Sequence, residues 1–163
     1  MTINETTYDT VPYNSNPFAQ SQPEQLAVVA KLFGLNPTLP FKARVLELGC
    51  SAGGNLIPLA ARYTDAIFFG IDLSERQIAA GQETIDALGL KNIELRHADI
   101  TSLRPGKQKF DYIICHGVFS WVPVAVQDAI FKVIRENLAE QGVAYISYNT
   151  YPGWKMREIV RVR

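Results

Sequence analysis

The stretch Val45-Leu46-Glu47-Leu48-Gly49-Cys50-Ser51-Ala52-Gly53-Gly54-Asn55 decides the fold of this chain. It begins as an apolar run, passes through a cluster of small residues, and resumes at Leu56 with apolar residues at helical spacing. This order predicts a buried strand, a tight turn and the start of a helix. Gly49 and Gly53 permit backbone conformations that a Cβ hinders, and the first amides of the following helix have no intrahelical partner. The turn is therefore a candidate seat for a cofactor.

The glycine spacing alone leaves the cofactor open. Gly49 and Gly54 also satisfy the outer positions of the dinucleotide fingerprint Gly-x-Gly-x-x-Gly, and Asp72 lies near the distance expected for a ribose-binding acid. A tight turn that holds no ligand is a third interpretation. The choice depends on the rest of the chain.

Composition and charge narrow the class of protein. The chain has 163 residues, of which 47% are hydrophobic and 20% charged, as expected for one globular domain. Sixteen basic residues balance sixteen acidic ones, which disfavours nucleic acid as a partner. No apolar run approaches the roughly 20 residues that span a bilayer, so we expect a cytoplasmic protein without membrane contact. The two cysteines and the Cys/His spacing predict free thiols and no metal site.

Strand and helix patterns alternate along most of the chain. The predicted strands are 44–49, 66–72, 92–97, 110–115 and 143–149. The helix before the last strand is predicted to run through Val126 to Leu138, and a terminal helix is predicted over 152–161. This alternation predicts a doubly wound, Rossmann-like parallel α/β sheet in the order 3-2-1-4-5. Ligands of such sheets bind beyond the carboxyl ends of the strands, where the strand order reverses. That rule brings together Gly49, Cys50, Asp72, Asp99, Cys115 and His116.

Residues 1–20 form a predicted N-terminal arm before the main domain, residues 21–163. The arm is rich in aromatic residues and proline and has no regular period, and we expect it to pack on the domain as a lid over the crevice. Ser21 and Glu24 have the spacing of a capping box, with a helix to follow whose apolar face is Leu26, Val29, Ala30 and Phe33. Ser74 and Gln77 form a second capping box, and Gly89 is the predicted end of that helix.

Four motifs now resemble class I S-adenosylmethionine-dependent methyltransferases. They are 47–53, with Ser51 in place of the middle glycine, Gly70-Ile71-Asp72-Leu73-Ser74, His97-Ala98-Asp99 and 110–118. Their order and spacing fit that family over residues 44–149. The arm, with Tyr8-Asp9, Val11-Pro12-Tyr13 and Pro17-Phe18, resembles the branch that carries a C-terminal methyltransferase regulatory domain and includes bacterial protein-lysine methyltransferases.

The resemblance implies S-adenosylmethionine as cofactor and assigns roles to its binding residues. Gly49, Ser51 and Gly53 would contact the methionine part, with Glu47 near its amino group. Asp72 would hold the ribose and Asp99 the adenine amino group, with Leu73 or Ile100 beside the ring and with Cys50 and Cys115 as small buried neighbours. Each acid also has a structural interpretation: Glu47 could organise the turn, Asp72 could favour the next helix, and Asp99 could serve in a loop turn.

His116, just past the fourth strand, is the candidate general base or acceptor-positioning group, although its ring could instead pair with neighbouring backbone. The (Asp/Asn)-Pro-Pro-(Tyr/Phe) sequence of exocyclic-amine DNA methyltransferases is absent here. Aromatic residues that follow the last two strands are candidates for an acceptor pocket, and these are Phe119, Trp121, Tyr148, Tyr151 and Trp154.

The predicted function is transfer of a methyl group to an unidentified acceptor, either a protein lysine or a small molecule. The alternatives are an NAD(P)-dependent oxidoreductase and an inactive cofactor-binding regulatory module. We also expect the catalytic domain to be truncated at its C-terminus, because the family usually continues past the fifth strand. The uncharged strand 143–149 would then be an open edge through which the chain could form a homodimer.

Overall fold

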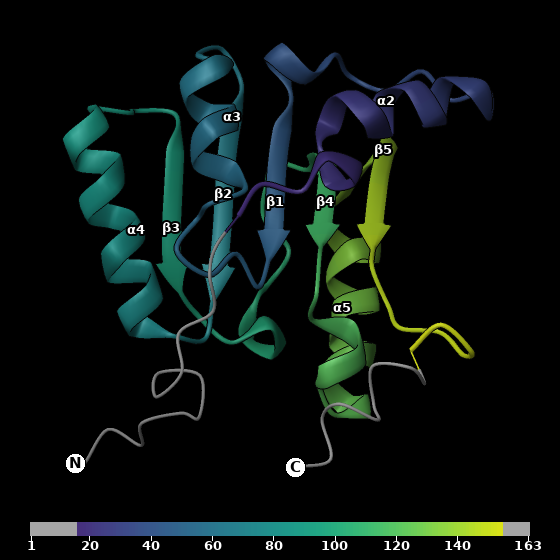
Figure 1. The fold of residues 1–163 in the computed structure, drawn as a ribbon. Coiled ribbons are helices and arrows are strands. Elements are labelled where there is room, and N and C mark those ends of the chain that lie inside the picture. The colour runs from purple at the N-terminus through teal and green to yellow at the C-terminus, as the bar shows by residue number, and fades with distance from the viewer. Residues whose placement is uncertain (1–15, 155–163) are drawn as a thin grey trace.

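A parallel sheet of five strands forms the centre of the computed structural model, which describes residues 16–154 (Figure 1). The strand order is β3-β2-β1-β4-β5, as the sequence predicts. Their bounds are β1 (Arg44–Leu48), β2 (Ile67–Asp72), β3 (Ile93–His97), β4 (Phe110–Cys115) and β5 (Leu138–Ile146). Because all pairs are parallel, the carboxyl ends of the strands share one edge of the sheet.

Helices cover both faces of this sheet and bury an apolar core on each. The helices α2 (Pro23–Leu32), α3 (Leu56–Arg62) and α4 (Glu75–Leu88) pack on one face, and α5 (Val124–Asn137) packs on the other. Short 3₁₀ turns complete the path: η1 (Ala19–Ser21), η2 (Pro40–Lys42), η3 (Ile100–Ser102) and η4 (Phe119–Trp121). Neighbouring residues of β1, Val45 and Leu46, point into opposite cores and are both fully buried, as in central parallel strands.

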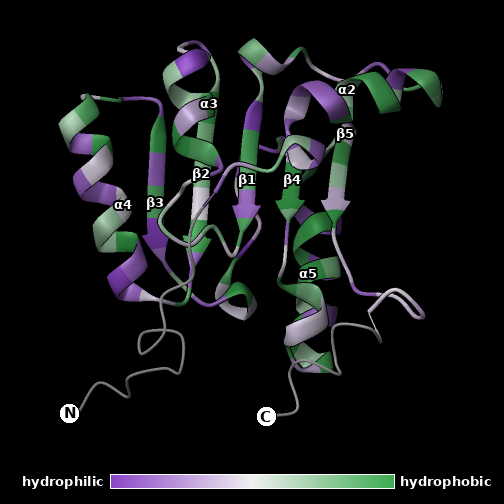
Figure 2. Ribbon diagram, in the orientation of Figure 1, coloured by the Kyte–Doolittle hydropathy of each residue, from purple (hydrophilic) through white to green (hydrophobic). Residues whose placement is uncertain are grey.

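The start and end of α4 follow the predicted local rules. The Ser74 hydroxyl oxygen accepts a hydrogen bond of 3.2 Å from the Gln77 amide, and Gly89 ends the helix with φ of 65°. Figure 2 shows hydrophilic and hydrophobic residues alternating along α4 and α5, as expected for helices with one buried face. Burial of Ile78 and Ile85 of α4 and of Ile130 of α5 fixes these faces on the sheet.

The prediction for the first helix was wrong in two respects. Ser21 lies in η1 and the N-cap of α2 is Gln22, without a side-chain cap, because the Ser21 hydroxyl donates to the Phe18 carbonyl instead (3.0 Å). The buried face holds Leu26, Ala27 and Ala30, whereas Phe33 is 81% exposed. Val29 is also exposed. Small alanine side chains let α2 approach the sheet closely, which turns the larger residues toward solvent.

The fifth strand begins earlier than predicted. Leu138, expected at the end of a helix, starts β5 directly after α5, and an irregularity in the register follows between the pairs Phe110–Leu138 and Tyr112–Val143. The strand ends at Ile146, and only the hydrogen bond from the Ser147 amide to the Cys115 carbonyl (3.0 Å) extends the ladder. Among residues 16–154, β5 pairs with β4 alone.

Residues 1–15 and 155–163 lie outside the described part of the chain, so most of the predicted arm and terminal helix does too. Within the described part, no helix has the length and apolar character needed to cross a bilayer.

Candidate functional site

The loop that follows β1 is built on left-handed backbone conformations. Gly49 and Gly53 have φ of 77° and 75°, as their glycine identity favours. The amides of Gly49 and Cys50 both donate to the Ile71 carbonyl, at 2.9 and 3.0 Å. This pair of bonds fixes the start of the loop against the carboxyl end of β2.

Ser51 adopts the same left-handed region with φ of 52°, where a residue with a Cβ is strained by about 1–2 kcal/mol. This is the position at which the resembled motif has its middle glycine. The Ser51 hydroxyl oxygen is buried and has no hydrogen-bond partner within residues 16–154. The loop therefore keeps its glycine-like backbone although one glycine is replaced.

Asp72, at the end of β2, fastens the loop to the next helix. Its Oδ2 accepts from the Ser51 amide at 2.7 Å, and its Oδ1 accepts from the Ser74 amide at 2.9 Å. The residue is half-buried, and each carboxylate oxygen retains a further lone pair for a ligand hydroxyl. Asp72 thus has a structural role in the loop that is compatible with a ribose-binding role.

Asp99 lies beside Asp72, because the Ala98 amide donates to the Asp72 carbonyl at 2.9 Å. The Asp99 Oδ1 accepts from the amide and the hydroxyl of Thr101, at 2.7 and 2.8 Å, and caps η3. The turn role considered from the sequence is therefore real. Both bonds go to Oδ1, and Asp99 is exposed, so its Oδ2 remains accessible to an outside donor.

Glu47 is the most buried carboxyl group of the site. Its Oε1 accepts from the Asn55 side-chain amide at 2.9 Å, whereas its Oε2 is buried without a partner among the described residues. Burial raises the pKa of Glu47 to about 8, against the lowering effect of the Asn55 hydrogen bond, and the charge of Asp72 adds to the rise. A cation placed at Oε2 would lower the pKa of Glu47 and favour its ionised form.

Asn55 is a functional neighbour that the sequence did not single out. Its Nδ2 donates to Glu47 and, at 3.3 Å, to the Ser21 hydroxyl, while its Oδ1 accepts from the Phe18 amide at 3.1 Å. One buried side chain thereby joins the residues before α2 to the acid beneath the glycine loop. An asparagine just after a glycine turn gives no separate signal in the sequence, because such residues are common in turns.

His116 contacts this N-terminal segment as well. Its ring centroid lies 3.8 Å from that of Phe18, and its Nδ1 lies 3.4 Å from the Tyr145 hydroxyl. Burial lowers the pKa of His116, so the ring is neutral at pH 7 and able to accept a proton. The Gln20 side chain also hydrogen-bonds Tyr145. The rings of Phe18 and Tyr145 therefore flank the predicted base, whose ring pairs with a phenol and with no backbone group among residues 16–154.

The cysteines belong to the packing of the site. Cys50 and Cys115 are free, buried and assigned to opposite cores of the sheet. Burial raises the pKa of Cys115 to about 12 and that of Cys50 well above its ordinary value. Neither thiol is ionised at neutral pH. Among residues 16–154 there is also no cluster of three or more side chains that could hold a metal ion.

The remaining predicted residues differ in their exposure and in their contacts. Leu73 is exposed and Ile100 half-buried, on the two loops that carry Asp72 and Asp99. The aromatic residues past β4 and β5 form two separate pairs: Phe119 with Tyr148 at 6.5 Å, and Trp121 with Trp154 at 5.3 Å. Tyr151 is exposed beside them in sequence.

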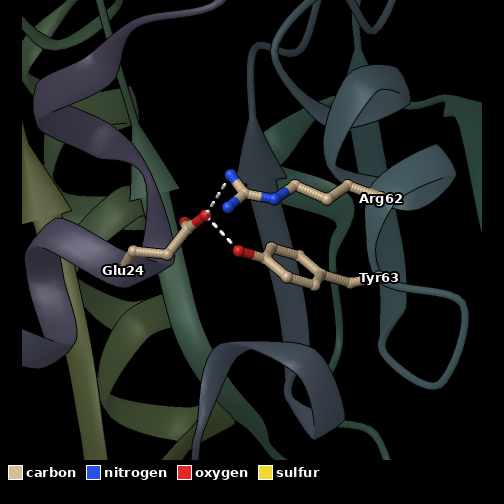
Figure 3. Close-up of polar contacts among 3 residues, drawn as sticks. All are labelled: Glu24, Arg62 and Tyr63. Carbon is tan, nitrogen blue, oxygen red and sulfur yellow. Dashed lines mark hydrogen bonds and ion pairs between the residues drawn. The ribbon is translucent and has the colours of Figure 1, made fainter.

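A second polar contact holds α2 to α3 (Figure 3). The Glu24 Oε1 accepts from the Tyr63 hydroxyl and from Arg62 Nη1, the latter at 3.1 Å. Together with Asn55, this contact fixes α2 to the helix that begins after the glycine loop.

Comparison with known proteins agrees with this geometry. A family model described as a methyltransferase domain matches residues 45–142, which include the loop, Asp72, Asp99 and His116. The uncharacterised protein RP789 of Rickettsia prowazekii (strain Madrid E) is 54% identical over 154 residues, which are 94% of this chain and 28% of that protein. A Bacteroides fragilis ribosomal RNA small subunit methyltransferase G is 32% identical over 108 residues, which are 65% of this chain and 48% of that enzyme.

Among solved structures, PKMT2 from Rickettsia typhi in complex with AdoHcy (S-adenosylhomocysteine) superimposes with a TM-score of 0.87 and 44% sequence identity. The match covers 92% of this chain and 29% of PKMT2. The present chain therefore spans less than a third of the length of RP789 and of PKMT2.

Proposed function

The chain belongs to the class I S-adenosylmethionine-dependent methyltransferases, and on this premise we propose that its methyl acceptor is the side-chain amine of a lysine in a protein. The methyl donor is S-adenosylmethionine, so a nicotinamide cofactor is not favoured. The main observation in support of this site is the Glu47 Oε2, which has no partner among residues 16–154 and lies beneath a left-handed loop, with Asp72 and Asp99 nearby. These three carboxyl groups are hydrogen-bond acceptors, and they suit a ligand that has an ammonium group, ribose hydroxyls and an adenine amino group.

Each acid then has one part of the cofactor to bind. The Glu47 Oε2 would receive the α-ammonium group, which would lower the pKa of Glu47 and favour its ionised form. Asp72 would accept the ribose hydroxyls with the lone pairs that Ser51 and Ser74 leave free. The exposed Oδ2 of Asp99 would accept from the adenine amino group.

S-adenosylmethionine would supply a methyl group that its positively charged sulfur activates for transfer, with the neutral thioether as the leaving group. The chain's own residues have to align the acceptor amine with that methyl carbon and exclude water. The lysine ammonium must first lose a proton. The amine lone pair would then form the nitrogen–carbon bond while the carbon–sulfur bond breaks. The electron pair of the carbon–sulfur bond would stay on sulfur. His116, neutral at pH 7, is the proposed group that takes the proton or positions the amine.

Two similarities support lysine as the acceptor. The segment before α2 resembles the branch that includes bacterial protein-lysine methyltransferases, and PKMT2 matches nearly the whole chain at 44% identity. A small-molecule amine remains the alternative acceptor for this site, and an inactive binding module is the alternative without turnover.

Calorimetry tests the cofactor site. We expect S-adenosylhomocysteine to bind and NAD not to bind. Asp99→Ala should weaken S-adenosylhomocysteine roughly fivefold, since a hydrogen bond to a neutral group contributes about 0.5–1.5 kcal/mol. Asp65→Ala, an exposed acid in the turn before β2, is the matched control and should change nothing. Equal affinities for Asp99→Ala and the parent chain would remove Asp99 from the site.

Mass spectrometry tests the acceptor. Incubation with S-adenosylmethionine and peptides that contain one lysine should add methyl groups to the lysine, and peptides with arginine in its place should stay unmodified. Methylation of a free amine such as spermidine but of no peptide would overturn the lysine proposal while leaving the cofactor site intact. Cofactor binding without turnover on peptide or small amine would instead favour the inactive module.

A further inference from the structure

A groove of about 740 Å³ lies away from the cofactor site, at the other end of the sheet. The first residues of three strands line it, namely Arg44 of β1, Ile67 of β2 and Phe110 of β4. The start of β3 and the loop after η3 complete its walls. The cofactor loop follows the last residue of β1, so the two sites use opposite ends of the same strands.

Basic side chains dominate the charge of this groove. Five cationic residues line it, against one acid, Glu94. The cations are Arg44, Lys91, Arg96, Arg104 and Lys107. Elsewhere acids must be in excess, because the whole chain is neutral, and the cofactor crevice indeed holds Glu47, Asp72 and Asp99. The charge is thus separated between the two sites.

Two aromatic rings form an apolar surface within the groove. Phe69 and Phe110 stack with their centroids 6.3 Å apart. The Arg96 guanidinium lies 5.0 Å from the Phe69 centroid, and that of Arg44 lies 5.7 Å from the Phe110 centroid. Stacking of this kind holds a guanidinium in place. The Arg96 Nη2 already pairs with Glu94 Oε1 at 2.6 Å, so the one acid of the groove occupies one of its five cations. The Arg44 Nε is buried and has no acceptor within residues 16–154.

We propose that this groove binds an acidic segment of a polypeptide partner. Its volume falls in the range of roughly 300–1,000 Å³ that is common for sites that enclose a ligand. Carboxylates of such a segment match the Arg44 guanidinium and the Lys91 and Lys107 ammonium groups, and its aliphatic carbons match the Phe69 and Phe110 rings. β3, whose first residues line the groove, pairs only with β2 among the described strands, so its outer edge lies open to an extended chain.

A nucleic acid fits these observations less well. Binding to a phosphate backbone relies on a basic surface that continues over many phosphates, usually in a domain with a strongly basic balance. Here five of the sixteen basic residues cluster in one groove of a chain whose net charge is zero, and they do not form a longer basic surface along that groove. Carboxylates spaced along a short peptide require no more than this.

Fluorescence anisotropy with a labelled octaglutamate peptide tests the proposal. Lys91 and Lys107 are exposed, and no side-chain hydrogen bond or ion pair involves either of them in the described structure. The double variant Lys91→Gln, Lys107→Gln should weaken the peptide roughly fivefold, as expected for two exposed charge pairs. Arg104→Gln, at a third exposed position of the groove, should act in the same direction.

The matched control is Lys31→Gln, Lys132→Gln, which removes the same charge from α2 and α5 outside the groove and should leave peptide binding unchanged. The proposal is overturned if octaglutamate shows no saturable binding, if both double variants weaken it equally, or if octauridylate binds more tightly than octaglutamate. The measurement needs neither cofactor nor turnover. If octaglutamate does not bind, the proposed methyltransferase function is therefore not affected. If no methyl transfer is found, the proposal for the groove is likewise not affected.

Discussion

Ser51 is the residue at which sequence and backbone conformation disagree most. It holds φ of 52° and a buried, unpartnered hydroxyl at a position where the family motif has glycine. We predict that Ser51→Gly raises the free energy of unfolding by about 0.5–1 kcal/mol, because relief of left-handed strain outweighs the added entropy of glycine in the unfolded chain. Urea denaturation measures the change. Ser51→Ala, which keeps the Cβ, serves as the control, and a gain as large for alanine would show that the hydroxyl and not the backbone is the cause.

Glu47 should make stability depend on pH. Its pKa is about 8 in the folded chain against an ordinary value of 4.5, so the folded state holds a proton that the unfolded state loses first. The contribution of Glu47 to the free energy of unfolding is fully present below pH 4.5. It declines by roughly 4 kcal/mol as the pH rises to about 8. We predict that Glu47→Gln, which cannot ionise, removes this decline.

Urea denaturation of the parent chain and of Glu47→Gln across this pH range gives the difference. Glu140→Gln, at an exposed position of β5, is the control and should follow the parent curve. Parallel curves for the parent and Glu47→Gln would contradict the buried, protonated state.

At this scale the sequence predicted which residues lie near the glycine loop better than it predicted their hydrogen bonds. Gly49, Asp72 and Asp99 come together as expected, because strand ends and turn residues can be recognised locally. The hydrogen bonds of Asn55 could not be predicted, since Phe18 and Ser21 lie 37 and 34 residues away in the chain. Such contacts depend on tertiary packing.

At the scale of the elements, Glu24 of α2 makes two contacts with α3 and the residue after it, one with Tyr63 and one with Arg62, and we expect them to differ in strength (Figure 3). We predict that Tyr63→Phe lowers the free energy of unfolding by about 1.5–3 kcal/mol, because Glu24 loses a hydrogen bond to its charged, partly buried carboxylate. Arg62→Ala should cost less than about 1 kcal/mol, because the Arg62 side chain is 65% exposed. Thermal or urea unfolding of the two variants compares them directly. A larger cost for Arg62→Ala would show that charge, not the phenol, holds α2.

The segment before α2 should act as a lid on the cofactor. Phe18 contacts His116, and its backbone amide is tied to Asn55, so this segment already lies on the crevice. We predict that Phe18→Ala speeds dissociation of S-adenosylhomocysteine roughly tenfold, within the 1.5–3 kcal/mol of a buried aromatic side chain. Stopped-flow displacement measures the rate. Gln25→Ala on the exposed side of α2 is the control, and equal rates for both variants would argue against a lid.

Elements with complete local signals were predicted well, and those fixed by packing were not. α4 has its cap at Ser74 and its stop at Gly89, and both are observed. The capping-box spacing of Ser21 and Glu24 is not used at the start of α2, and tertiary packing decides which of its residues are buried, so Val29 and Phe33 were misjudged. β5 has no local signal at its start, so the position of Leu138 was misjudged too. The groove at the first residues of the strands was not predicted, because its cations come from separate parts of the chain.

On the scale of the whole molecule, the outer edge of β5 is open among the described residues. We predict that the chain self-associates through this edge in a concentration-dependent way. Ala144→Lys, at an exposed position of β5, should shift the mass measured by light scattering toward the monomer. Glu140→Lys, also exposed on β5, is a second test in the same direction. A monomer at every concentration for the parent chain would contradict this prediction.

The two hydrogen bonds of Asp72 have a consequence for how quickly a ligand is captured. Through Ser51 and Ser74, one carboxylate holds both the glycine loop and the first turn of α4 in a single arrangement. Conformational entropy of the loop is therefore lost during folding and not during the encounter with the ligand. We therefore expect the association rate to be limited by the approach of the ligand and by movement of the segment before α2, and not by rearrangement of the glycine loop.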